Sequence, residues 1–279
     1  MSSTTKSKEI KLKYIDIFLY PLISFLIILL LWTLLSLFVN QNVKVILDPI
    51  ETVEKIGIEM KGKYFFKAIF GTLGKSFISF FISFTAALLL SVLSFNFKVV
   101  KRIISPVISI FRSIPTAAVI LILLLCLGSK TLPIAVAILV VLPLSYQNIL
   151  SGLENIDPNL IEMASTFKVS KFRQITNIYL PGALPSLLSS IISSFGLNIK
   201  VIIAAEVMGL PTVSIGYMIL ISKSGLEFDI AFVWLVISVL LSLFMEIILK
   251  IISRLLMPYK YDDVRKIKRF FGRFKKEHL

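Results

Sequence analysis

The sequence predicts an all-α integral membrane protein with six transmembrane helices. Of its 279 residues, 57% are hydrophobic and 16% are charged, and the mean hydropathy is +0.91. Soluble domains carry about 25% charged residues, so this composition excludes a water-soluble globular enzyme. Six apolar runs, each near the roughly 20 residues that a helix needs to cross a bilayer, supply the predicted spans.

The first apolar run, residues 17–39, is longer than a signal-peptide core and predicts a retained transmembrane helix after a tail of residues 1–16. Residues 40–71 form a long connecting segment. A core of residues 72–255 then holds five further spans, and a basic tail follows at 256–279. These five spans are predicted at residues 72–93, 103–127, 132–150, 184–208 and 230–252.

The basic residues predict that both termini lie in the cytoplasm. Of the 30 Lys and Arg residues, 20 fall in four segments on one side of the predicted membrane, with 4, 3, 3 and, from Lys250 onward, 10. Such an excess marks the cytoplasmic side. The net charge of +14 is therefore interpreted as a topology signal, and the run from Arg265 to Lys276 as facing lipid headgroups. We expect no nucleic-acid partner.

The extracytoplasmic segment 40–71 contains a helix-start pattern. Asp48 is a favourable N-cap, Pro49 suits the first helical position and Glu51 stands at the third. The pattern predicts a short interfacial helix.

The loop after the fourth span, residues 155–181, has a regular pattern that predicts two short helices. Asp157 and Pro158 suit a helix start, and Leu160, Ile161, Ala164 and Phe167 then share one face. Ser170 is a candidate cap for a second helix, whose shared face is formed by Phe172, Ile175 and Ile178.

Catalysis by this chain alone is not expected. His278 is the only histidine and Cys126 the only cysteine, so a His/Cys metal site and a Ser/His/Asp triad are excluded. Gly74-Lys75-Ser76 matches the end of a phosphate-binding loop, but Ile69 stands where its first glycine belongs. No cofactor is predicted for this chain.

One motif is specific. Glu162-Met163-Ala164, then Lys168, then Ile178-Tyr179-Leu180-Pro181 has the spacing of the EAA loop in binding-protein-dependent ABC importer permeases. Five of its seven fixed positions match in identity. Arg112 to Pro115, Asn155 to Asn159, Ala204-Ala205-Glu206 and Ser214 to Tyr217 add to a resemblance to the nitrate, sulfonate and taurine branch over residues 45–255.

The resemblance implies a type I ABC importer permease with the MetI-like fold, in the plasma membrane of a bacterium. It implies a homodimer with two ABC ATPase subunits, which would bind ATP and Mg, and an extracytoplasmic solute-binding protein. Residues 151–181 would be the coupling loop, anchored by Glu162. Met163 and Lys168 depart from the motif. Lys168 replaces a turn glycine, and either adopts a positive φ at about 1 kcal/mol or changes the turn.

Arg112, Lys200, Glu206 and Glu246 are ionisable residues within predicted spans, where each costs roughly 2.5 to 3.5 kcal/mol at mid-bilayer. Pro115 predicts a helix break beside Arg112, which, with Ser113 and Thr116, either lines the path or caps freed carbonyls. Lys200 meets an anion or forms an interhelical ion pair. Glu206 is either a gate or a surface residue at the outer interface. Glu246 is expected to pair with Lys250, four residues on.

The substrate stays open at this stage. Buried cations favour anions such as nitrate, sulfonates or taurine, whereas related permeases for a thiamine pyrimidine precursor or riboflavin are the alternative. A competing class is a secondary transporter, which needs intramembrane acids for ion coupling, and only Glu206 and Glu246 are available.

Overall fold

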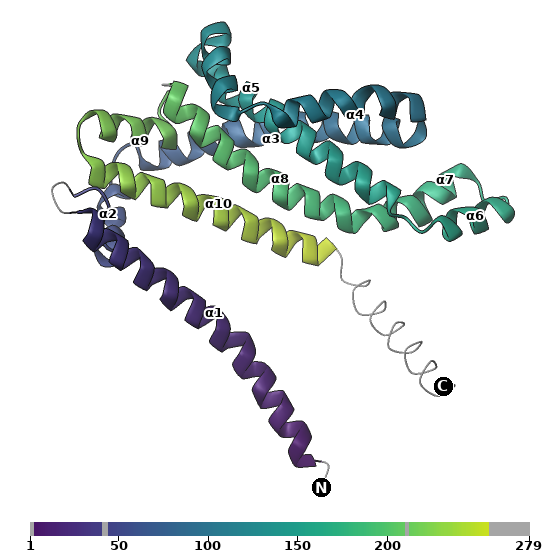
Figure 1. The fold of residues 1–279 in the computed structure, drawn as a ribbon, viewed down its shortest axis with the longest axis horizontal. Helices are drawn as coiled ribbons and strands as arrows, with labels where there is room; N and C mark the ends of the chain where they lie inside the picture. The colour runs from purple at the N-terminus through teal and green to yellow at the C-terminus, as the bar shows by residue number, and fades with distance from the viewer. Residues whose placement is uncertain (1–2, 41–43, 210–211, 257–279) are drawn as a thin grey trace. The chain divides into compact units, whose positions relative to one another are not determined.

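The computed structural model describes residues 3–40, 44–209 and 212–256, with side chains from Leu19 onward (Figure 1). Within these residues every regular element is helical, so the all-α prediction is confirmed. The predicted basic tail beyond Leu256, with His278, lies outside the described residues. The helices are α1 (Ser3–Val39), α2 (Pro49–Glu59), α3 (Phe65–Asn96), α4 (Lys98–Ser113), α5 (Thr116–Glu154), α6 (Pro158–Thr166), α7 (Lys171–Gln174), the π-helix η1 (Ile175–Tyr179), α8 (Leu180–Gly209), α9 (Ile215–Ser224) and α10 (Phe228–Leu256).

The chain forms two compact units. The first comprises residues 1–67 and 218–237, and the second comprises residues 68–217 and 238–279. In the first unit, the Asp48 carboxylate accepts a 2.8 Å hydrogen bond from the Glu51 backbone N–H, so the predicted start of α2 is confirmed. The Trp32 indole donates to the Leu47 carbonyl at 2.9 Å, tying α1 to the segment before α2.

Five helical stretches in the described residues are long and apolar enough to cross a membrane. Four of them correspond to the first, second, fifth and sixth predicted spans. The remaining stretch is α5. The span predicted at residues 103–127 is wrong as a single helix, because α4 ends at Ser113 and α5 begins at Thr116. Between them, Ile114 and Pro115 are extended, as expected where proline lacks an N–H and its ring clashes with the preceding turn.

Helix α5 joins the end of that broken span to the fourth predicted span. Its 39 residues would measure about 58 Å if straight, nearly twice the hydrocarbon core. Gly128, with φ of 70°, bends the chain, and Figure 1 shows the first part of α5 turning away from the second. Only glycine adopts this backbone at no steric cost.

The core of the second unit lies between α5 and α8, which run side by side (Figure 1). Leu132 and Val136 of α5 and Ile202 and Ala205 of α8 are fully buried against one another. A second cluster packs Tyr146 of α5 against α3 and α4, and the Tyr146 hydroxyl donates to Ser94 at 2.9 Å. The functional residues below are positioned on this framework.

Candidate coupling loop and intramembrane charges

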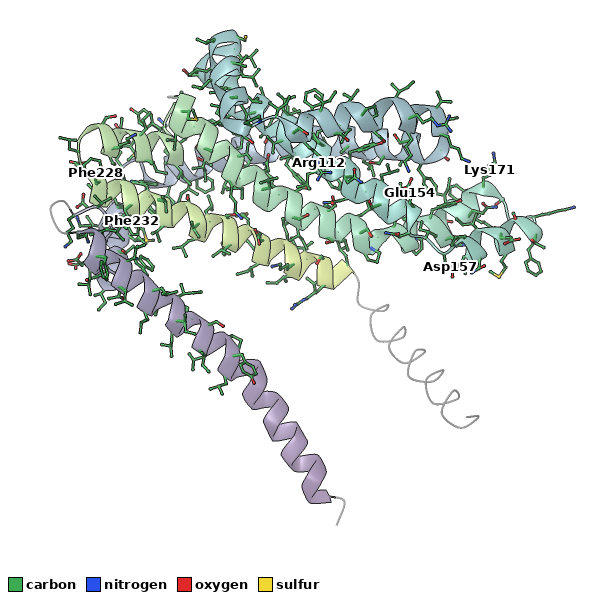
Figure 2. All side chains as sticks on the ribbon, viewed as in Figure 1. Arg112, Glu154, Asp157, Lys171, Phe228 and Phe232 are labelled. Carbon is green, nitrogen blue, oxygen red and sulfur yellow. The ribbon has the colours of Figure 1, made fainter. Side chains whose placement is uncertain are left out.

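Helix α6 begins as the sequence predicts. The Asp157 carboxylate accepts a 2.9 Å hydrogen bond from the Asn159 backbone N–H, and Pro158 occupies the first turn. Ala164 is buried, whereas Glu162, Met163 and Phe167 are exposed. In Figure 2, Asp157 and Lys171 label the start of the two parts of this segment, beyond Glu154 at the end of α5. An exposed ridge containing Glu162 is thus held on a capped helix.

Lys168 takes the left-handed conformation that the missing glycine would have supplied, with φ of 50°. Its N–H donates to Ser165 at 3.0 Å, and the Val169 N–H donates to Ala164 at 2.9 Å. These two bonds form the Schellman motif that ends many helices. Of the two outcomes expected for Lys168, the structure therefore has the one in which lysine copies the glycine backbone.

The second predicted helix is not a separate element. Helix α7 has four residues and continues through η1 into α8, giving one helical run over Lys171–Gly209. The Ser170 side chain makes no cap hydrogen bond, so that part of the prediction is wrong. Instead, the Gln174 amide donates to the Val169 carbonyl at 2.8 Å. Ile178 belongs to η1, and Leu180 and Pro181 to the first turn of α8.

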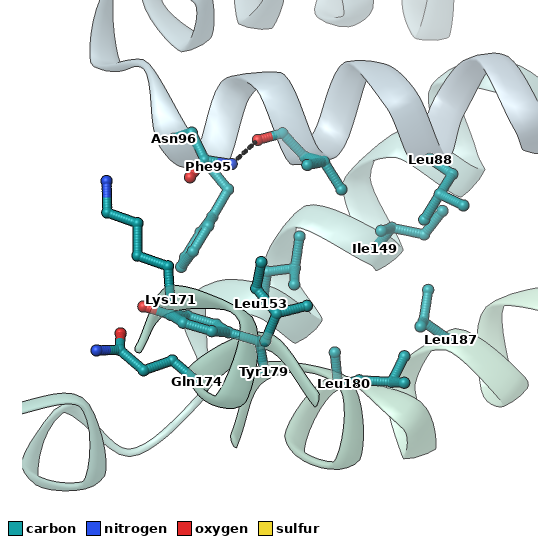
Figure 3. A pocket seen from close by; sticks show the side chains of 13 residues that line it. Leu88, Phe95, Asn96, Ile149, Leu153, Lys171, Gln174, Tyr179, Leu180 and Leu187 are labelled. Atoms are coloured by element: carbon teal, nitrogen blue, oxygen red, sulfur yellow. Dashed lines mark hydrogen bonds between the residues drawn. The ribbon is translucent and has the colours of Figure 1, made fainter. Parts of the chain in front are cut away.

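A cavity of about 400 Å³ lies behind this run (Figure 3). Leu88 of α3, Leu153 of α5 and Leu187 of α8 are among its apolar walls, and Asn96, Lys171 and Gln174 are its polar lining residues. The Tyr179 ring meets the Phe95 ring edge-on, with centroids 5.7 Å apart. The π-helical turn of the motif therefore packs over a cavity, and its Tyr179 ring contacts Phe95 of α3.

The residues around the helix break lie on the surface of the second unit. Arg112, Ser113 and Pro115 are exposed, and Thr116 is half-buried (Figure 2). The Ser113 hydroxyl donates back to the Ser109 carbonyl at 2.9 Å. Among the described residues no hydrogen bond or ion pair engages the Arg112 guanidinium, so the carbonyl-capping alternative has no contact to support it.

Glu206 is completely buried, so of its two expected roles the surface residue is wrong, and the gate stays a prediction. Its carboxylate accepts hydrogen bonds from Lys75 Nζ at 2.8 Å, Thr72 Oγ1 at 2.9 Å and the Gly216 N–H at 3.2 Å. Thr72 Oγ1 in turn accepts the Ile215 N–H at 3.0 Å. We call this set the Glu206 cluster. It ties α3, α8 and the start of α9 together.

Sequence reasoning missed Lys75, which lies 131 residues before its partner. The tripeptide containing it drew attention only as an incomplete phosphate-binding motif. The available signal was a lysine inside a predicted span, which must find an acid or water. The two motifs around Glu206 and Gly216 that contributed to the family resemblance meet in this cluster.

Lys200 forms an interhelical ion pair, which was one of its two expected roles. Its Nζ is 3.8 Å from Glu246 Oε1, and Lys250 Nζ is 4.0 Å from Glu246 Oε2. The predicted Glu246–Lys250 pair is thus present, and Glu246 of α10 also pairs with Lys200 of α8. Both distances exceed hydrogen-bond range, and the lysine side chains are 64% and 56% exposed.

A polytopic helical bundle with a capped loop helix and charges inside its spans defines the class of membrane transport permeases. The chain belongs to the family of inner membrane components of binding-protein-dependent transport systems, whose model matches residues 80–257. Members are permease subunits of ABC importers and not enzymes. The chain is accordingly a multi-pass membrane protein.

Named relatives point to one branch. The putative aliphatic sulfonates transport permease protein SsuC of Escherichia coli is 28% identical over 156 residues, covering 56% of this chain and 59% of the relative. Its Bacillus subtilis counterpart is 25% identical over 187 residues, covering 66% of each. The taurine transport system permease protein TauC of Escherichia coli is 25% identical, covering 57% and 58%. The matches span about six tenths to two thirds of these relatives.

Solved structures show the same fold. The inward-facing MetNI methionine ABC transporter matches with a TM-score of 0.59 at 20% identity, covering 68% of this chain and 95% of the other. A bacterial alginate ABC transporter matches with a TM-score of 0.59 at 16% identity, covering 91% and 94%. The predicted MetI-like permease fold is therefore confirmed.

Proposed function

We propose that this chain is the permease subunit of an importer for a small sulfonate or taurine-like solute. A solute-binding protein delivers the substrate, and partner ATPase subunits supply the energy from ATP and Mg. The naming of three relatives for sulfonates or taurine supports this substrate class. In this proposal, two permease copies enclose the path, and both termini face the cytoplasm of a bacterial cell.

The coupling role rests on one observation, the exposed ridge of α6. Met163 is 51% exposed and Phe167 is 76% exposed, on a helix capped at both ends. Large apolar side chains, exposed beside an acid that forms no ion pair within the described ranges, fit a partner cleft better than they fit water. In the proposal, α6 lodges in an ATPase subunit, Glu162 forms its polar anchor, and Ala164 holds the helix to its own subunit.

Co-purification with the ATPase tests this assignment. Glu162→Lys reverses the charge at the proposed anchor and is expected to abolish recovery of the ATPase with the tagged permease. Glu227→Lys makes the same charge change at an exposed residue before α10 and is the matched control. Unchanged ATPase recovery and unchanged transport with Glu162→Lys would overturn the coupling assignment.

The residues at the helix break are proposed to line the path. Arg112, with Ser113, Pro115 and Thr116, lies where α4 stops, and its guanidinium is exposed without a partner in the described part of the chain. An exposed cation at the break in the span predicted at residues 103–127 is tolerated beside water and not beside lipid. Arg112→Gln is expected to reduce uptake of an anionic solute while leaving ATPase recovery unchanged, and unchanged uptake would contradict the assignment.

A further inference from the structure

The groove between α8 and α10 contains charged side chains whose ion pairs are too long for hydrogen bonds. Lys200 on α8 and Glu246 and Lys250 on α10 line a hollow of about 460 Å³, together with Ser189 and Ser193. We call these residues the charge groove. Its volume lies within the range of about 300 to 1,000 Å³ typical of small-molecule pockets.

The charge groove runs from mid-span on α8 to the end of the span predicted at residues 230–252, where Lys250 lies. Gly196 is the midpoint of the span predicted at residues 184–208, and a methyl group added there would lie 2.4 Å from Glu246 Oε1. Glu246 therefore reaches the α8 backbone at mid-span. Lys200 is one helical turn, about 6 Å, further along α8. An exposed lysine at the depth of Lys200 cannot face lipid, so this part of the charge groove faces water or protein.

The ion pairs in the charge groove are loose. One carboxylate is shared by two ammonium groups at 3.8 and 4.0 Å, leaving one positive charge in excess. A bound monoanion would bring the net charge of the site to zero. Two separated cations around one acid also leave room for an oxyanion between them.

A second hollow of about 230 Å³ shares Lys200 and is lined by Ser242 of α10. The Ser242 side chain is 2% exposed, and its hydroxyl has no hydrogen-bond partner among the described residues. Buried hydroxyls are normally satisfied, so this one calls for a ligand or water acceptor. Ser242 of α10 and Lys200 of α8 thus line the same hollow.

We propose that the charge groove is a binding subsite on the translocation path for a singly charged oxyanion, a sulfonate on a short apolar chain. Lys200 and Lys250 hold the sulfonate oxygens, and Glu246 neutralises one of the two lysine charges in the empty state. Net charge favours an alkanesulfonate over an aminoalkanesulfonate, because the zwitterion would leave the excess positive charge in place. The inference rests on the proposed importer function and names its substrate charge.

Thiol modification in the assembled complex tests the charge groove without requiring transport. Cys126→Ser removes the exposed native thiol, and Ser193→Cys places a thiol in the groove. The anionic 2-sulfonatoethyl methanethiosulfonate is expected to react about tenfold faster, relative to a free thiol, than the cationic trimethylammonium analogue. Lys200→Met should remove most of this preference, and ethanesulfonate should protect the thiol better than taurine.

Lys101→Met is the matched control, because it removes a lysine from an exposed pair with Glu154 elsewhere in the unit. It should leave the preference unchanged. A thiol at residue 193 that reacts with neither reagent, and likewise one at Ser189→Cys, would overturn the proposal. So would a preference that Lys200→Met does not alter, or taurine protection equal to that of ethanesulfonate.

Uptake into proteoliposomes separates this inference from the importer function. Lys200→Met is expected to lower kcat/KM for ethanesulfonate by about tenfold or more, with ATPase recovery unchanged. Uptake by Lys200→Met within twofold of the unmodified complex would sink the subsite and leave the importer function standing. A complex that imports only uncharged or cationic solutes has the same consequence. Failure to assemble with an ATPase would instead remove the importer function itself.

Discussion

Glu206 and Glu246 both lie on membrane-spanning helices and both pair with lysine, yet their surroundings are opposite. Glu206 is fully buried and has three donors within 3.2 Å, and its lysine is 15% exposed. Glu246 is 24% exposed, and its two lysines lie outside hydrogen-bond range and are largely exposed. With three donors inside the protein, the Glu206 carboxylate is committed to internal contacts. The comparison fits a structural role for the Glu206 cluster and the transport role that we propose for the charge groove.

The largest effect on this comparison is expected from Glu206→Ala. The substitution leaves the Lys75 ammonium buried without its acid, which costs about 3 to 5 kcal/mol of unfolding free energy. SDS titration in mixed micelles measures the loss. The double variant Glu206→Gln, Lys75→Gln should recover much of it. A single variant as stable as the unmodified chain would show that the cluster does not hold the fold.

Thr72→Val tests the hydroxyl that links Glu206 to α9. The change keeps the side-chain shape and leaves the Ile215 N–H without its acceptor. An unsatisfied buried donor costs about 1 to 3 kcal/mol, measured by the same titration. Ser109→Ala removes a hydroxyl from an exposed position and should change the free energy little.

Two glycine substitutions compare the regions directly. A methyl group at Gly216 would meet Glu206 Cβ at 2.3 Å and backbone atoms of Val207 and Ile203 at 2.7 and 2.8 Å. These atoms cannot move away cheaply, so Gly216→Ala should cost about 1 to 3 kcal/mol. A methyl group at Gly196 meets the tip of Glu246, which can swing aside. Equal stability losses in the two variants would contradict the comparison.

Glu246→Gln should have the smallest effect on stability. Its ion pairs resemble exposed ones, whose contribution is below about 1 kcal/mol. Its effect should appear instead in the charge groove, where a thiol at Ser193→Cys would prefer the anionic reagent more strongly. Stability falling as far as with Glu206→Ala would remove the distinction between the two acids.

The elements that the sequence predicted well are those encoded locally. Asp48 and Asp157 cap the helices after them, and Pro115 breaks the span that contains it, because each effect acts within one turn. Run lengths similarly located the spans other than the one predicted at residues 103–127. The prediction of a separate second loop helix was wrong. Ser170 followed by a short apolar pattern looks the same in the sequence whether the helix stops after a few turns or continues into a span.

The surroundings of the two intramembrane acids could not be predicted from the sequence, for a physical reason. Glu206 was expected as a gate or as a surface residue at the outer interface, but its burial depends on Lys75, far away in the sequence. Glu246 was explained by Lys250 at i+4, and nothing local signals that Gly196 leaves room for it on another helix. Contacts between helices decide both environments, and a single sequence carries no record of them.

The unbroken helical run over Lys171–Gly209 places the second part of the loop and Lys200 on one continuous helix. Its 39 residues measure about 58 Å, so a tilt of about 5° at one end displaces the other by about 5 Å. The π-helical turn at Ile175–Tyr179 is where this run departs from the regular α-helical hydrogen-bond pattern, and it packs over the cavity beside Phe95. In the coupling role that we propose, a displacement of the loop would reach the charges near mid-span through this turn.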